Sequence, residues 1–394
     1  MPVATHIAPR ENPQKAPLSL LGLPGDGIGP EVLGAALPIF DAMRIPIKLD
    51  IGKIGWSCWQ AAGDPVPQDT WEKISHADVV LLSAITSKSR REAEDDLPPH
   101  LRQRAIEYVS PVIQLRQRLD LYANVRPIYD LSGRDKFRAV VIRENTEGLY
   151  SGLDYWPAPA PIVDLLAEAT RAKPLGREHS GHISASVRIQ TRHGLSRIFL
   201  FAFEFARQNG YRKVTLADKP NVLRHSGAFA RECFEEAAEK FPEIIADVQN
   251  VDAVALWLVM RPERFGVIVA ENMFGDILSD LAAGVMGGLG FAPSENIGTT
   301  GAYYEPVHGS APHLAGQNRA NPSAMFLTIA LALKKHGYGL EAAAIQRAVS
   351  ACYQAAKVTY DAGGSLSTAE AASEIISRAA HDAETTRCGH LPGN

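Results

Sequence analysis

The chain has 394 residues, of which 46% are hydrophobic, 21% charged and 7% aromatic. This length favours two domains, and these proportions are typical of a globular protein; they exclude a disordered chain, a collagen-like fibre and a small disulfide scaffold. The 40 Lys and Arg residues nearly balance the 44 Asp and Glu residues, which leaves a net charge of −4. We therefore expect no nucleic-acid partner and no strongly charged polymer as a partner.

The cysteines and the apolar runs point to a cytoplasmic protein. The four cysteines are far apart in the sequence and form no CxxC pair, which fits a reducing compartment and no structural zinc site. The longest apolar runs, such as 79–82 and 254–260, are too short for a membrane span. Residues 1–17 lack the apolar stretch of a signal peptide, so we expect them to form a mobile tail.

From Leu18 onward, short β-rich runs alternate with helical patterns, which is typical of an α/β protein with a largely parallel sheet. The residue patterns predict strands at 18–23, 45–51, 79–84, 137–143, 183–189, 213–217 and 267–270. They predict helices at 31–43, 100–119, 194–208, 222–240, 274–286, 323–335, 341–358 and 368–382. The segment 154–181 interrupts this alternation and is too long for an ordinary loop, so we expect an inserted arm there.

A glycine-rich turn follows the first predicted strand. Gly25, Gly27 and Gly29 are spaced G-x-G-x-G, and the sixth position is Pro30. The Rossmann fingerprint is G-x-G-x-x-G, whose last glycine lies where helix meets strand. The spacing alone therefore favours a tight strand–helix turn over a standard Rossmann nucleotide site.

Two aspartates lie four residues apart in the segment 272–280. On a helix, Asp276 and Asp280 share one face, where their charges repel, so a cation is expected between them. Carboxylate oxygens are hard ligands that suit Mg²⁺ or Mn²⁺. The alternative interpretation is a solvated helix face with an acid near its N-terminus. The residues alone support both interpretations equally, and the strand before the segment and the small residues after it favour a cleft at this place.

Three arginines, Arg116, Arg126 and Arg143, lie beside apolar strands. An arginine grips a carboxylate through two hydrogen bonds, so three of them near strand ends indicate a substrate with more than one carboxylate. For any one of them, ordinary surface ion pairing is the alternative interpretation.

Together these motifs resemble those of the β-decarboxylating dehydrogenases, the isocitrate/3-isopropylmalate dehydrogenase family. The matching segments follow the family order and span about residues 18–380. They are 23–31 (LPGDGIGPE), 115–127 (LRQRLDLYANVRP), 141–150 (VIRENTEGLY), 217–223 (ADKPNVL), 272–280 (NMFGDILSD) and 305–312 (EPVHGSAP).

The resemblance implies an α/β fold of two open domains around a cleft, isopropylmalate dehydrogenase-like and distinct from a standard Rossmann domain. The first, cofactor-binding domain would comprise residues 18–121 together with 287–394. The second, 122–286, would carry the substrate, metal and dimer contacts, with the inserted arm near 154–181. The family works as a homodimer whose active sites borrow residues from the partner subunit.

The resemblance also implies the reaction, an oxidative decarboxylation of a 3-substituted (2R)-malate with hydride transfer to NAD. Mg²⁺ or Mn²⁺ would be bound by Asp276, Asp280 and Asp252 of the partner subunit, and would polarise the substrate hydroxyl. Lys219 matches the residue that handles the hydroxyl proton, and Tyr150 the residue that protonates the enolate carbon. The carboxylate-binding set corresponds to Arg116, Arg126 and Arg143.

For the cofactor, the resemblance implies NAD, with NADP as the alternative. The matching residues are Ile28, Glu305, His308, Gly309, Ser310, Ala311, His313 and Asn321. Many NAD-using relatives have an Asp after the Ser-Ala-Pro motif, and NADP-using relatives often have Lys and then Tyr. This chain has His313 and Leu314 there. NAD is favoured because no cluster of cations replaces the NADP set.

The pocket for the C3 substituent combines two patterns. Ser110 is retained from the isocitrate pattern, whereas Val112 stands where isocitrate enzymes have Asn and isopropylmalate enzymes have an apolar residue. Arg90 and Arg91 would add cations if their loop folds over the pocket. An isocitrate-like substrate is favoured over 3-isopropylmalate, homoisocitrate, tartrate or D-malate, and a biosynthetic-pathway isocitrate analogue such as a phosphonate. A different class of function, that of a non-catalytic regulatory relative, is disfavoured because Tyr150, Lys219 and the aspartates are all present.

Overall fold

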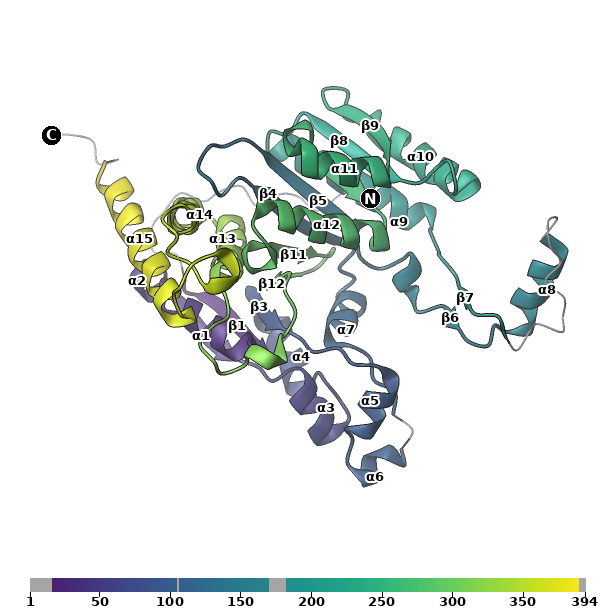
Figure 1. Cartoon of the computed structure of the whole chain (residues 1–394), viewed down its shortest axis with the longest axis horizontal. Coiled ribbons are helices and arrows are strands. Elements are labelled where there is room, and N and C mark those ends of the chain that lie inside the picture. The colour runs from purple at the N-terminus through teal and green to yellow at the C-terminus, as the bar shows by residue number, and fades with distance from the viewer. Residues whose placement is uncertain (1–15, 105, 170–181, 390–394) are drawn as a thin grey trace.

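In the computed structural model, which describes residues 16–104, 106–169 and 182–389, the core of the chain is one large sheet (Figure 1). Its strands are β1 (Leu18–Gly25), β2 (Ile47–Ile51), β3 (Val79–Ala84), β4 (Ala123–Tyr129), β5 (Arg138–Glu144), β8 (Lys213–Asp218), β9 (Ile245–Asn250), β10 (Val267–Ala270), β11 (Pro293–Ile297) and β12 (Ala302–Pro306). Their order across the sheet is β2-β1-β3-β12-β11-β4-β5-β10-β8-β9.

Helices cover the sheet and its edges. From the first half of the chain they are α1 (Gly29–Ala36), α2 (Ile39–Ala42), α3 (Trp56–Ala62), α4 (Gln68–His76), α5 (Arg90–Asp95), α6 (Pro99–Arg102), α7 (Pro111–Arg118) and α8 (Ala160–Ala169). From the second half they are α9 (Arg192–Gln208), α10 (Arg224–Ala238), α11 (Val251–Met260), α12 (Asn272–Met286), α13 (Ser323–Lys335), α14 (Gly339–Gln354) and α15 (Thr368–Gly389). Among the described residues, no helix is both long enough and apolar enough to cross a membrane.

Two parallel groups of strands meet at an antiparallel centre. On one side β2, β1, β3 and β12 are parallel, and on the other β5, β10, β8 and β9 are parallel. Between them, β11 pairs antiparallel with both β12 and β4, and β4 pairs antiparallel with β5. The two parallel groups therefore run in opposite directions. The prediction of an α/β fold with a largely parallel sheet is confirmed.

The strands form where the sequence has short, continuous apolar runs, as expected for strands covered on both faces. Every residue of β3 and of β10 is buried. One apolar core cluster extends along the sheet and includes both Leu81 of β3 and Ile268 of β10. The predicted domain limits at 121 and 287 stay a prediction, since the sheet and this cluster both continue across them.

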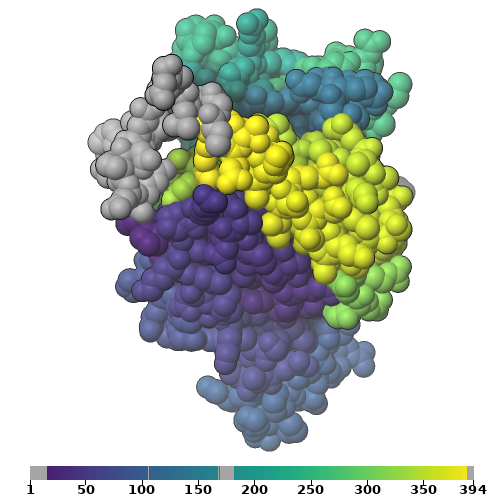
Figure 2. All heavy atoms as spheres, turned by 90° about the vertical axis from the view of Figure 1, so that its left-hand side faces the viewer, coloured from purple at the N-terminus to yellow at the C-terminus, as the bar shows by residue number. Residues whose placement is uncertain are grey.

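The C-terminal helices pack beside the N-terminal strands. Figure 2 shows them, in yellow, against the first part of the chain, in purple. The side chain of Thr368 at the start of α15 donates a 2.7 Å hydrogen bond to Glu31 of α1. The first and last parts of the described chain are therefore in contact, while the discontinuous first domain stays a prediction.

Several predicted elements differ from the observed ones. The predicted helix 31–43 is divided into α1 and α2, with Pro38 between them. The predicted helix 100–119 is wrong over its middle, because it is divided into α6 and α7 and α7 begins at Pro111, which cannot continue a preceding helix. The predicted strand 183–189 shortens to β7 (Ala185–Ser186). The strands β4, β9, β11 and β12 were not predicted.

The expected arm is present over its described residues. β6 (Asp154–Tyr155) pairs antiparallel with β7, and with α8 they extend away from the sheet (Figure 1). Residues 170–181 of the predicted arm, and residues 1–15 of the predicted tail, lie outside the described residues.

Candidate active site

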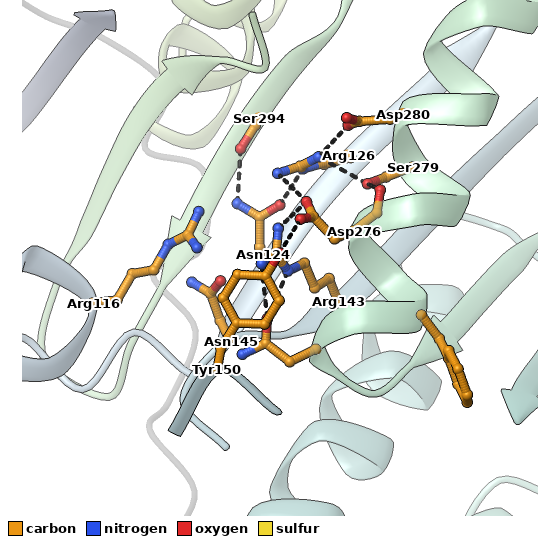
Figure 3. Close-up of polar contacts among 12 residues, drawn as sticks. Arg116, Asn124, Arg126, Arg143, Asn145, Tyr150, Asp276, Ser279, Asp280 and Ser294 are labelled. Atoms are coloured by element: carbon orange, nitrogen blue, oxygen red, sulfur yellow. Dashed lines mark hydrogen bonds and ion pairs between the residues drawn. The ribbon is translucent and has the colours of Figure 1, made fainter. Parts of the chain in front are cut away.

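The helix α12 carries the two aspartates singled out in the sequence. It begins directly after β10, and the side chain of its N-cap residue Glu271 accepts a 3.0 Å hydrogen bond from the backbone N–H of Phe274. Because residues four apart share a helix face, Asp276 and Asp280 project together. They face the antiparallel pair β4 and β5 (Figure 3).

Two of the three predicted arginines hold these aspartates. Arg126 Nη1 donates a 2.9 Å hydrogen bond to Asp280 Oδ1, and its Nη2 lies 3.5 Å from Asp276 Oδ1. Arg143 forms an ion pair with Asp276 and donates to Asn272 Oδ1 at 2.9 and 2.8 Å. Within one chain, guanidinium groups therefore compensate the repulsion between the two carboxylates.

The third arginine completes a crowded cationic cluster. Arg116 Nη2 lies 3.5 Å from Glu305 Oε1, and its Nε is buried without a hydrogen-bond partner among the described residues. Burial, together with the neighbouring charges of Arg116 and Arg126, lowers the pKa of Arg143 to about 10. A site in which cations repel one another at close range favours the binding of an anion.

Tyr150 joins the same cluster from the segment after β5. Its hydroxyl donates a 2.6 Å hydrogen bond to Asp276 Oδ2, and its ring lies 4.8 Å from the Arg143 guanidinium carbon. Burial, together with the hydrogen bond to Asp276, raises the pKa of Tyr150. A phenol is protonated at neutral pH, so Tyr150 can serve as a proton donor.

Sequence reasoning missed a buried polar ladder behind the arginines. Asn124 Oδ1 accepts a 2.6 Å hydrogen bond from Arg126 Nε, and Asn124 Nδ2 donates to Asn296 Oδ1 at 2.7 Å. Asn296 Nδ2 in turn donates to Glu305 Oε1 at 2.9 Å. Asn124 and Arg126 are two residues apart on one strand and share a face, a pattern that the sequence contained.

Lys219 and Asp252 lie together but apart from this cluster. Lys219 follows β8, Asp252 lies in the first turn of α11, and their Nζ and Oδ1 atoms are 2.5 Å apart. Within the described part of a single chain, no three His, Cys, Asp or Glu residues are arranged to hold a metal ion. The structure therefore brings Asp276 and Asp280 together, but not Asp252 with them.

The predicted cofactor residues near the glycine-rich turn do meet those of the C-terminal loop. The Ile28 N–H donates a 2.8 Å hydrogen bond to the Ser310 carbonyl, and Thr86 Oγ1 lies 2.7 Å from Ser310 Oγ. Gly27 has a φ of +56°, and a Cβ there would lie 1.9 Å from that carbonyl oxygen. The next loop residue, Ala311, has a φ of +35°.

The rest of that loop offers polar atoms and open space. His308 Nε2 is buried without a hydrogen-bond partner among the described residues, and burial lowers the pKa of His308. A Cβ added to Gly309 would meet no described atom within 4 Å, and His313 is exposed. Asn321 Nδ2 donates to Asp361 at 3.2 Å. An unpartnered ring nitrogen beside open backbone suits a bound polar ligand.

Glu305 contacts residues of the arginine cluster, and its predicted contact with the cofactor stays a prediction. Its Oε1 accepts hydrogen bonds from Asn296 and, at 3.0 Å, from the Tyr303 hydroxyl. The carboxylate therefore belongs to the polar ladder and to Arg116.

The residues expected around the C3 substituent lie at the start of α7. Ser110 Oγ is 3.2 Å from Ser87 Oγ, so two hydroxyls lie side by side. Val112 is half-buried against the apolar cluster around Leu82 and Leu115. One polar and one apolar surface are thus both present.

The expected cations Arg90 and Arg91 do not reach this pocket. Their side chains are 77% and 93% exposed and form ion pairs with acids four residues later on the chain. The ammonium of Lys88 is paired as well, since its Nζ is 2.8 Å from Asp96 Oδ2 and 4.6 Å from the centre of the Trp56 ring.

Comparison with known proteins identifies the relatives of the chain. The family described as "Isocitrate/isopropylmalate dehydrogenase" matches residues 19–377. Protein DlpA of Legionella pneumophila is 52% identical over 366 residues, which are 92% of this chain and 59% of DlpA, so the chain spans about three fifths of that relative. Homoisocitrate dehydrogenase of Methanocaldococcus jannaschii is 38% identical, with 89% of this chain and 95% of that protein covered. The crystal structure of isocitrate dehydrogenase from Methylococcus capsulatus is 34% identical and superimposes with a TM-score of 0.77, covering 92% of this chain and 99% of that one.

Proposed function

The chain belongs to the isocitrate/isopropylmalate dehydrogenase family of decarboxylating dehydrogenases. From this membership we propose that it oxidises and decarboxylates a 3-substituted (2R)-malate with an anionic C3 substituent. The observation that carries this proposal is the cluster of three arginines around two aspartates and a protonated tyrosine. Such a cluster binds a substrate with several carboxylates and places a proton donor beside it.

The arginines bind the substrate. Arg116 has a buried N–H without a partner among the described residues, whereas Arg126 and Arg143 exchange their aspartate partners for substrate carboxylates. Because their guanidinium groups are fixed by Asn124 and Asn272, they orient the substrate with little loss of side-chain entropy. The C2 and C3 carbons then lie beside Tyr150.

Asp276 and Asp280 fit a divalent metal, because their hard carboxylate oxygens lie on adjacent turns of one helix. With Asp252 of the partner subunit as the third ligand residue, they would hold Mg²⁺ or Mn²⁺. When bound, this ion would polarise the C2 hydroxyl and stabilise the negative charge left by the loss of CO₂.

We assign the two proton transfers to two different chains. Lys219 of the partner subunit accepts the proton of the C2 hydroxyl as the substrate is oxidised. The Tyr150 hydroxyl then delivers its proton to C3 after CO₂ leaves.

A homodimer follows from this assignment, because one chain keeps Lys219 and Asp252 apart from Asp276. Apolar side chains on α11 and α12 support a second copy as the partner. Leu256, Met260 and Ile277 are 57%, 65% and 59% exposed, and exposed apolar side chains on adjoining helices are typical of subunit interfaces.

For the cofactor we propose NAD, held at its adenosine half by the segment 308–313 with Ile28 and Asn321. The unpartnered His308 Nε2 and the open backbone at Gly309 support this placement. No side chain with a fixed positive charge occupies position 313 to bind a 2′-phosphate, which favours NAD over NADP. In this arrangement the carboxylate of Glu305 forms an ion pair with Arg116.

The paired hydroxyls of Ser87 and Ser110 support an anionic C3 substituent, because both can donate hydrogen bonds to a carboxylate, and isocitrate is the first compound to test. A panel of 3-substituted malates, each with NAD⁺ or NADP⁺ and Mg²⁺ or Mn²⁺, tests the proposal. We expect turnover of isocitrate or homoisocitrate with NAD⁺, abolished by EDTA. A preference of a hundredfold or more for 3-isopropylmalate would contradict the anionic substituent.

A further inference from the structure

A buried acid lies at the end of each of three neighbouring parallel strands, close in sequence to a candidate site residue. Glu144 follows Arg143 at the end of β5, and Asp218 precedes Lys219 at the end of β8. Glu271 follows β10 and caps α12, the helix of Asp276. Because these strands are neighbours in the sheet, their ends lie at one edge. The three acids are 4%, 3% and 8% exposed.

One cation from the base of the arm reaches two of these acids. Arg188, between β7 and α9, has Nη2 3.4 Å from Asp218 Oδ1 and Nε 3.8 Å from Glu271 Oε2. Its side chain is 14% exposed. Glu144 has other hydrogen-bond partners, because its carboxylate accepts hydrogen bonds from Thr146 and from the backbone N–H of Glu147.

The direct contacts leave several polar atoms around Arg188 unsatisfied. Among the described residues, the buried atoms without a hydrogen-bond partner include Arg188 Nε and Nη1, Asp218 Oδ2, Glu271 Oε2 and Gln190 Oε1. A cavity of about 10 Å³ is lined by these four residues together with Glu144 and apolar side chains. This is about the volume that one water molecule needs, and a water joins two donors to two acceptors.

The chain directly after Arg188 also contacts the segment of Tyr150. The Gly148 N–H donates to the Ile189 carbonyl at 2.8 Å, and the Thr191 N–H donates to Glu147 Oε2 at 2.8 Å. The arm's return segment therefore contacts the elements that carry Tyr150, Lys219 and Asp276.

We propose that Arg188, bridged by one buried water to Asp218 and Glu271, is a positioning residue that fixes Lys219, α12 and the Tyr150 segment relative to one another. Arg188 touches no reacting atom, and its role in turnover rests on the proposed function. Removing its charge leaves two carboxylates facing one another across a cavity the size of one water molecule, and their repulsion moves the strand ends that carry the site residues.

The test compares Arg188→Gln and Arg188→Lys with Arg192→Gln. Arg192, the first residue of α9, lies four residues further along the chain, is 50% exposed and forms ion pairs with Glu232 and Glu236 on the surface. Its variant therefore controls for the loss of an arginine in this segment. We expect Arg188→Gln to lower kcat about 100-fold, the effect of roughly an ångström of misplacement. KM should change less than kcat, because the arginines of the binding cluster remain. Arg188→Lys should recover most of kcat, and Arg192→Gln should match the wild type.

A folded Arg188→Gln enzyme with wild-type kcat would overturn the proposal, as would Arg188→Lys being no better than Arg188→Gln. A crystal structure of the wild-type dimer provides a readout that needs no activity and no variant. We expect a water within hydrogen-bond distance of Arg188 Nη1 and Asp218 Oδ2, and an empty cavity beside other well-ordered buried waters would refute the bridge. Failure of the proposed function appears differently, as a wild-type enzyme without turnover of any substituted malate.

Discussion

The hydroxyl of Tyr150 donates a 2.6 Å hydrogen bond to Asp276 Oδ2. The proton donor that we propose for decarboxylation thus contacts a carboxylate that we propose as a metal ligand. Asp276 also pairs with Arg143, so a change at this single carboxylate affects the tyrosine, the arginine and the metal together. The effects of substitutions at these three residues are therefore expected to be non-additive.

Asp276→Asn should weaken the binding of Mn²⁺ and lower activity by orders of magnitude, because an amide is a poorer ligand for a hard cation and carries no charge. Calorimetric titration with Mn²⁺ measures the affinity, and steady-state assays measure the activity. Asp95→Asn on α5, which removes only an exposed carboxylate, is the matched control. Unchanged Mn²⁺ affinity in Asp276→Asn would exclude this carboxylate as a ligand.

Active sites shared between two chains predict complementation. Tyr150→Phe dimers and Lys219→Met dimers should each be inactive, but subunit exchange should create hybrids with one intact site. Random exchange yields at most about a quarter of the wild-type activity, because half of the dimers are hybrids and half of their sites are intact. As a control, a parent carrying both substitutions should restore nothing when mixed with Tyr150→Phe. If the enzyme is fully active while light scattering shows it to be a monomer, the active sites are not shared between two chains.

The pocket for the C3 substituent predicts a change in specificity. Val112→Asn should raise kcat/KM for isocitrate relative to 3-isopropylmalate by about one to two decades, because a carboxylate left without a partner costs roughly 1–3 kcal/mol. Val109→Asn, at an exposed position just before the helix, should leave the ratio unchanged. If the ratio is equally unchanged in Val112→Asn, this side chain does not contact the substituent.

Two glycines of the first turn and helix predict opposite changes in stability. Gly27→Ala should lower the free energy of unfolding by more than about 2 kcal/mol, because its φ is +56° and a Cβ would lie 1.9 Å from a backbone oxygen of Ser310. Gly34→Ala in α1 should raise it by about 0.5–1 kcal/mol, because no described atom lies within 4 Å of the added Cβ and alanine favours a helix. Urea denaturation measures both changes. An unchanged free energy of unfolding in Gly27→Ala would show that the loop around Ser310 shifts to accommodate the added methyl group.

Local patterns in the sequence predicted much of the fold. Continuous apolar runs gave the buried strands β1, β3 and β10, and the spacing of Asp276 and Asp280 placed them on one helix face. Those features depend on residues close together in the chain. The predicted helix 100–119 is wrong over its middle because Pro111 begins α7 and a proline cannot continue a preceding helix.

The missed features depend on residues far apart in the sequence. The bond between Asn124 and Asn296 joins β4 to β11, a pairing that only the order of strands in the sheet determines. Arg188 lies in the predicted strand 183–189, of which only Ala185–Ser186 forms a strand, and its acidic neighbours become apparent only when three strand ends meet. The position of Glu305 beside Arg116 could not be inferred from its motif for the same reason.

The strand order also determines which parts of the sheet can form first while the chain is being synthesised. β4, β5, β8, β9 and β10 come from one continuous stretch and can complete their part of the sheet as it leaves the ribosome. β3, in contrast, pairs with β12 and α1 packs against α15, both made much later. Until then β3 presents an open edge with apolar faces, the kind of surface that recruits other chains. We therefore expect β1 and β3 to stay open to contacts with other chains for longer than the strands of the middle segment.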